Sequence, residues 1–117
     1  MGNIGRNIVA LLAGLLGSGV CVAALEAMGH RAVSGRGVFV VAVIGLAVGA
    51  IVGGALSVRI SGLAAFAWIV AAMLGALALV NVLSFPHPIW FVPAAAAALA
   101  AGAWLAVRMA ARPEAAR

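Results

Sequence analysis

Residues 60–107 form a run of 48 residues without a single Asp, Glu, Lys or Arg. A bilayer core about 30 Å thick is crossed by roughly 20 helical residues, so this run is too long for one crossing and fits two. Prolines at two positions within 84–88 cannot continue a helix and divide the run there. Two further uncharged stretches, 7–25 and 37–58, each fit one crossing. The sequence therefore predicts four membrane-spanning helices.

The composition also indicates lipid as the solvent, because 68% of the residues are hydrophobic and only 8% are charged. In soluble proteins about a quarter of the residues are charged. A chain of 117 residues is too small to hide this much apolar surface in a water-soluble core. We therefore expect one all-α domain over 1–117, an up-down-up-down transmembrane four-helix bundle with helices at about 7–29, 38–58, 63–83 and 89–110.

The N-terminal apolar segment is interpreted as the first of these helices and not as a cleaved signal peptide. Cleavage near residues 23–27 would leave three spans and place Glu26 at the new terminus. The residues before Cys21 also lack the small residue that a lipoprotein cleavage site needs directly ahead of its cysteine. The segment is therefore expected to remain part of the bundle.

The arginines predict how the bundle is oriented, since positive residues are retained on the cytoplasmic side of a membrane. Only Arg31 and Arg36 fall on one side of the predicted bundle. The other side holds Arg6, Arg59, Arg108, Arg112 and Arg117. Both termini are therefore expected in the cytoplasm. Because apolar runs separate these arginines, they do not form the clustered basic surface that nucleic-acid binding needs, and no nucleic-acid partner is expected.

Small residues at four-residue spacing predict where the helices pack, because helices in lipid associate through close approach of small side chains. The second predicted helix carries two successive G-x-x-x-G steps, and the first carries a matching ladder of small residues. The predicted packing positions are Gly14, Ser18, Gly45, Gly49, Gly53 and Gly75. Packing within the bundle and packing between two copies both remain open. Glycine and alanine form these interior faces, and aromatic residues to line a substrate pocket are expected to be missing from them.

The polar residues other than arginine gather at the outer end of the predicted bundle. Glu26 and His30 lie one turn apart on one face of the first helix. A carboxylate in the last turn of a helix meets the negative end of the helix dipole and needs a partner. Asn81, His87 and Trp90 belong to the same end of the bundle. Since ionisable residues within a span are costly and point to function, these five residues form the candidate site.

Two interpretations of Glu26 remain open at this point. The carboxylate either binds a proton or a cation, or forms an ion pair with Arg31 that fixes the helix end. One carboxylate with two histidines at these spacings is a weak metal-binding pattern, so neither a metal nor another cofactor is expected. Cys21 and Ser84 lack the neighbouring base that an enzymatic nucleophile needs, and the chain is expected not to be an enzyme.

Three segments resemble a group of small bacterial membrane proteins that have four helices and no assigned activity. These are residues 25–30, which contain E-x-x-G-H, the pair Gly53-Gly54, and residues 81–91, which contain N-x4-P-H-P-x-W-F. The resemblance implies a four-helix bundle in the bacterial cytoplasmic (inner) membrane, and it implies no mechanism. The alanine and arginine bias without lysine is also typical of a bacterial genome rich in G and C.

Two functions are consistent with these features. The first is a structural or accessory component that acts through helix–helix contacts in the lipid bilayer, as a homo-oligomer or with a partner membrane protein. The alternative is a proton- or cation-linked small transporter or channel that uses Glu26. A cavity that reaches Glu26 from outside favours the transporter, and a sealed bundle of small residues counts against it.

Overall fold

The computed structural model describes residues 2–32, 35 and 37–115, and within these residues the chain forms four helices and no strand. The helices are α1 (Gly2–Ala32), α2 (Gly37–Ser61), α3 (Ala65–Ser84) and α4 (Phe91–Ala115). Each of them contains a segment that is long and apolar enough to cross a membrane. The prediction of an all-α, four-helix, multi-pass membrane protein is confirmed.

The helices differ from the predicted ranges mainly at their ends. The predicted ends were set by the thickness of the bilayer core. A helix can continue beyond the core until a residue breaks it, and α1 accordingly starts at Gly2 and α4 reaches Ala115. Gly62 ends α2, because it adopts a φ of 76°, which side chains rarely allow. Its N–H donates to the Val58 carbonyl at 2.7 Å, the usual capping bond at a left-handed helix end.

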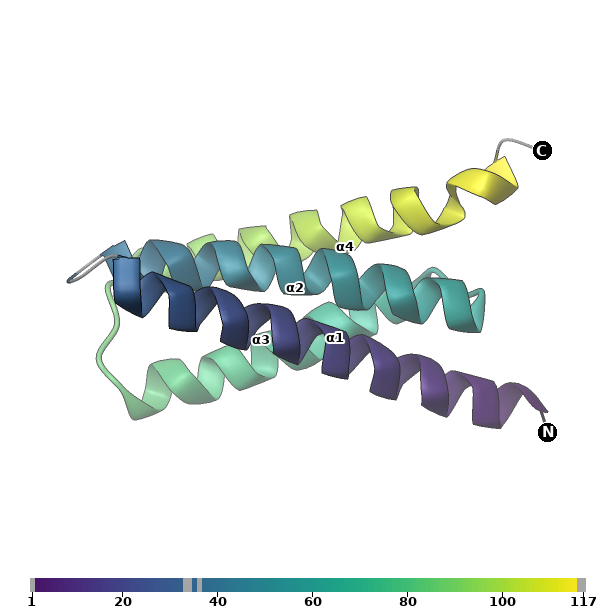
Figure 1. Ribbon diagram of the computed structural model, residues 1–117, viewed down its shortest axis with the longest axis horizontal. Coiled ribbons are helices and arrows are strands. Elements are labelled where there is room, and N and C mark those ends of the chain that lie inside the picture. The colour runs from purple at the N-terminus through teal and green to yellow at the C-terminus, as the bar shows by residue number, and fades with distance from the viewer. Residues whose placement is uncertain (1, 33–34, 36, 116–117) are drawn as a thin grey trace.

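The two ends of the bundle carry different parts of the chain (Figure 1). Both termini lie at one end together with the connection from α2 to α3, and we call this the termini end. The connections from α1 to α2 and from α3 to α4 lie at the opposite end, which we call the His87 end. Sequential helices therefore run antiparallel, as the up-down-up-down topology requires.

Helix α2 is the centre of the bundle. It packs against α1, α3 and α4, whereas α1 and α4 do not touch each other within the described residues. The contact between α1 and α3 is much smaller than that between α1 and α2. Helix α1 is therefore attached to the bundle almost entirely through α2.

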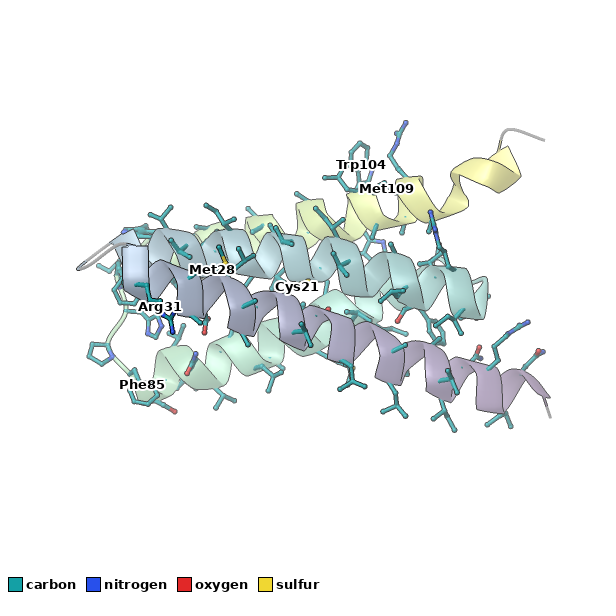
Figure 2. All side chains as sticks on the ribbon, viewed as in Figure 1. Cys21, Met28, Arg31, Phe85, Trp104 and Met109 are labelled. Carbon is teal, nitrogen blue, oxygen red and sulfur yellow. The ribbon has the colours of Figure 1, made fainter. Side chains whose placement is uncertain are left out.

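The buried apolar side chains come mainly from α2, α3 and α4. Larger members of this core are Leu46, Val70, Leu74, Phe91 and Leu99. Apolar side chains also cover the outward faces. Figure 2 shows Trp104 projecting away from the bundle on α4, and Met109 of the same helix is exposed. An outer surface of this kind fits a lipid surrounding, since soluble proteins of this size rarely expose such large apolar patches.

The glycine steps of α2 face α1. Ser18 Oγ donates to the Gly49 carbonyl at 2.7 Å, and Ser57 Oγ donates to the Ala10 carbonyl at 2.6 Å. Both hydrogen bonds join a side chain to the backbone of the other helix and are buried. A Cβ placed on Gly53 would meet the side chain of Ser18 and the backbone carbonyl of Gly14, both on α1. The close approach of these two helices thus occupies the glycine face within the bundle.

The other predicted packing glycines lie in two different contacts. A Cβ placed on Gly45 would lie 3.7 Å from Leu25 Cβ, and Gly14 faces Ser57 and Gly53. Both therefore belong to the contact between α1 and α2. Gly75 faces α4 instead, where a Cβ would lie 3.4 Å from Leu99 Cδ1.

Candidate functional site

Two adjoining cavities lie between α1 and α3 at the His87 end, with volumes of about 230 Å³ and about 460 Å³. Both are lined by Glu26, Ala42, Asn81 and Phe91, so they form one continuous depression, which we call the α1/α3 groove. Helices α1 and α3 supply its two walls, and residues of α2 and α4 form its floor. The weak contact between α1 and α3 explains why the groove opens between these two helices.

The smaller cavity is the deep part of the groove. Its lining is almost entirely apolar, from residues Gly19, Val22, Ala23, Leu46, Leu74, Leu77 and Ala78. Gly19 and Glu26 are seven residues apart on α1, which corresponds to about 10 Å along a helix. The groove therefore extends from the His87 end some way toward the middle of the bundle.

Glu26 and Asn81 are the polar side chains that both cavities share. Glu26 comes from α1 and Asn81 from α3. They therefore lie on opposite walls of the groove and border the same two cavities. Glu26 is half-buried and Asn81 is exposed.

Arg31 does not form the ion pair with Glu26 that one interpretation of the sequence required. Among the side chains that the structure describes, no arginine or histidine nitrogen lies within 4.0 Å of the Glu26 carboxylate. Arg31 is exposed at the end of α1, at the same end of the bundle as Phe85 (Figure 2). The described contacts of Glu26 are therefore those of the groove wall.

His87 is held at the mouth of the groove by its backbone and by aromatic rings. Its Nδ1 lies 2.8 Å from the Phe85 carbonyl oxygen, and since a carbonyl only accepts, Nδ1 donates this hydrogen bond. The ring centroid lies 5.1 Å from that of Phe39 and 4.7 Å from that of Phe91. We call Phe39, His87 and Phe91 the aromatic cluster. All three line the larger cavity.

The groove brings together part of the predicted site. Glu26, Asn81 and His87 all line it, although they come from α1, α3 and the loop between α3 and α4. Trp90 does not line it, but its ring centroid lies 6.3 Å from that of Phe91, which does. His30 belongs to α1, and its side chain lies outside the described part of the structure.

The expectation that no aromatic residue lines the interior is wrong, because Phe39, Phe85 and Phe91 all line the larger cavity. Phe39 stands near the start of α2 and Phe91 is the first residue of α4. Single aromatic residues at helix ends do not repeat at helical spacing, so no periodic pattern in the sequence indicates them. The topology offered a signal, since the start of α2 and the start of α4 meet at the His87 end.

The donor atoms of the groove suit a non-covalent ligand better than a metal ion. Within the described side chains, no three His, Cys, Asp or Glu groups lie close enough together to hold a metal. Small-molecule sites are typically concave and mostly apolar with a few convergent polar groups. The α1/α3 groove has this character, with one carboxylate and one carboxamide among apolar and aromatic side chains.

Comparisons with known proteins identified no match for this chain. The chain matches no protein-family model, no curated protein and no solved structure. The resemblance to small bacterial membrane proteins therefore stays a prediction.

Proposed function

We propose that the protein is a proton- or cation-linked small transporter that uses Glu26 as its cation-binding group. The observation that supports this most is the cavity that reaches Glu26 from the His87 end. A carboxylate within a membrane span is costly, and such groups usually belong to ion pathways, proton relays or ligand sites. Neither an enzymatic step nor a cofactor is part of this proposal.

The packing of α1 supports transport over simple binding. Beyond the groove, toward the termini end, the Ser57 bond to Ala10 and the glycine contacts hold α1 tightly on α2. The lining of the groove extends toward the termini end as far as Gly19 on α1 and Leu74 on α3. A site that opens toward one end of the bundle corresponds to one state of an alternating-access cycle. Helix α1 is the element best suited to move between such states, because α2 is almost its only neighbour.

The test of this proposal is the Glu26→Gln variant in liposomes. Glutamine keeps the size of the side chain and removes the charge, so we expect proton- or cation-driven flux to fall at least about tenfold, as for a loss of about 1.4 kcal/mol of cation binding. Flux is measured with a pH-sensitive dye under imposed proton, sodium or potassium gradients. Glu114→Gln is the matched control, since Glu114 is the chain's one other acidic residue. Equal flux in both variants would reject Glu26 as the cation-binding group.

A second candidate function is that of an accessory component acting through helix–helix contacts. Exposed alanines on α4, at positions 96, 97, 100 and 101, favour it, because small residues on a lipid-facing surface allow another helix to approach closely. A second copy of the chain or a partner membrane protein would occupy this face.

We place the protein in the bacterial cytoplasmic membrane with both termini in the cytoplasm, on the strength of the arginine distribution and the resemblance to small bacterial membrane proteins. Ile89 is 96% exposed in the connection from α3 to α4, and Leu63 is 48% exposed in that from α2 to α3. In a Cys21→Ser background, we expect a membrane-impermeant maleimide to label Ile89→Cys in intact cells and Leu63→Cys only after permeabilisation. The opposite labelling pattern would mean that the termini are outside.

A further inference from the structure

The donor atoms of the groove discriminate between kinds of cation. Hard inorganic cations such as calcium take about six to eight oxygen ligands. The groove offers the Glu26 carboxylate and the Asn81 carboxamide, and the remainder of its lining is mainly apolar or aromatic. Two such side chains fall short of the oxygen ligands that a hard divalent cation needs. The lining suits an organic cation, which carries apolar groups of its own.

The aromatic cluster supports an ammonium as the charged group. Ammonium groups are attracted to the faces of aromatic rings at distances up to about 6 Å. Phe39 and Phe91, whose centroids are 6.1 Å apart, line the larger cavity together with Glu26. An ammonium in this cavity would meet a carboxylate on one side and aromatic rings on another. His87 holds the cluster together because its ring packs on both phenylalanines.

The deep part of the groove provides room for an apolar chain attached to that ammonium. Gly19 lines it, and a Cβ at this position would meet nothing within 4 Å. On the facing wall Leu77 is 65% exposed, so this wall continues into the lipid-facing surface of α3. A second helix, about 10 Å in diameter with its side chains, is too wide for a cavity of about 230 Å³. Part of an alkyl chain fits in this space.

We propose that the cation bound at Glu26 is the ammonium headgroup of a membrane phospholipid, with one acyl chain lying in the deep part of the groove toward Gly19. This inference rests on the proposed function, because it assigns the ligand of the same carboxylate. Asn81 lies three residues before the end of α3 and shares both cavities with Glu26, so both polar groups lie near the His87 end, which faces one layer of lipid headgroups when the bundle crosses a bilayer. Arg31 adds a positive charge at the same end of the bundle, so a zwitterionic headgroup meets both signs of charge (Figure 2).

The experiment compares the lipids that stay bound to the protein. The protein is extracted from nanodiscs containing equal amounts of phosphatidylethanolamine and phosphatidylglycerol, and native mass spectrometry counts each retained lipid. We expect at least about a fivefold preference for phosphatidylethanolamine in the natural protein, a ratio that corresponds to about 1 kcal/mol. Glu26→Gln is expected to abolish the preference, and Glu114→Gln to keep it. An unchanged preference in Glu26→Gln would overturn the proposal.

A second pair of variants tests the acyl-chain position without removing charge. Gly19→Leu fills the deep part of the groove, and Gly5→Leu adds the same side chain elsewhere on α1. Neither added Cβ meets an atom within 4 Å, so both proteins are expected to fold, and circular dichroism checks this. We expect Gly19→Leu to lower retained phosphatidylethanolamine at least about fivefold and Gly5→Leu to leave it unchanged. Equal retention in the two variants would place the acyl chain outside the groove and overturn the proposal.

Two further outcomes separate this inference from the proposed function. Glu26-dependent flux in liposomes made only of phosphatidylglycerol, together with no lipid preference, would overturn the phospholipid as ligand and leave the transporter proposal standing. A Glu26-dependent lipid preference without any Glu26-dependent flux would keep the ligand and overturn transport. Selective retention of added dodecylammonium over phosphatidylethanolamine would identify a free amphiphile as the source of the ammonium, and would overturn the phospholipid as the ligand.

Discussion

Replacing Gly53 with alanine is expected to loosen α1 from α2 and to lower the melting temperature of the bundle more than any other single-methyl change on α2. The added Cβ would overlap Ser18 Oγ and the backbone carbonyl oxygen of Gly14. The hydroxyl could rotate away, but the carbonyl oxygen moves only with the whole helix. Overpacking of this kind costs about 1–3 kcal/mol, which corresponds to a fall of at least about 4 °C for a chain of this size. Circular dichroism of the protein in mild detergent measures it.

Gly45→Ala is the control, because it makes the same change on the same face of α2. A Cβ at Gly45 would lie 3.7 Å from Leu25 Cβ, an ordinary van der Waals contact. Alanine is also a better helix former than glycine by about 1 kcal/mol, so the melting temperature is expected to stay constant or to rise. Equal losses in the two variants would show that the contact at Gly53 is no closer than the contact at Gly45.

The fold could be predicted because the thickness of the bilayer sets the length of a membrane-spanning helix, and the uncharged runs in the sequence can be compared with that length. The two prolines at 86 and 88 divided the longest run correctly, and α3 indeed ends at Ser84. The sequence could not predict which helix packs against the glycine face of α2. Spacing at Gly45, Gly49 and Gly53 defines a face on α2 but does not say which helix lies against it. The contacts with α1 settle this, since the face is filled within one chain.

Only the polar residues of the candidate site could be predicted from the sequence. Topology placed Glu26, Asn81 and His87 at one end of the bundle, and all three line the groove. The same topology applied to Phe39 and Phe91 would have predicted the aromatic cluster. The groove itself could not be predicted, because it opens where α1 and α3 make little contact, and the spacing of residues in the sequence does not give the extent of that contact.

The exposed alanines of α4 also alter the expectation for the oligomeric state. Since the glycine face of α2 is filled by α1, it is not available to a second copy. Exposed small residues on the outward side of α4 are then one place where a second copy could pack. Ala101 is exposed on that side, and its neighbour Gly102 is buried against α2. These two adjacent positions therefore separate packing within the chain from packing between chains.

Gly102→Leu is expected to unfold the contact between α2 and α4, whereas Ala101→Leu is expected to leave the fold of the chain intact. A Cβ at Gly102 would lie 2.8 Å from Ala50 Cβ and 2.9 Å from the Ala47 carbonyl oxygen, and leucine adds three more carbons. The cost is at least about 1–3 kcal/mol, and circular dichroism against temperature measures it.

Light scattering coupled to size exclusion gives the mass of each variant of this pair, and liposome flux gives its activity. A transporter that works as a single chain keeps both its mass and its flux in Ala101→Leu, because the added side chain points into lipid. A lower mass in Ala101→Leu, with the thermal transition of the remaining chain unchanged, means that a second copy covers α4. That result would favour the accessory function, in which the contacts of this face are the activity of the protein. Equal melting temperatures for Gly102→Leu and Ala101→Leu would contradict the assignment of Gly102 to the contact with α2.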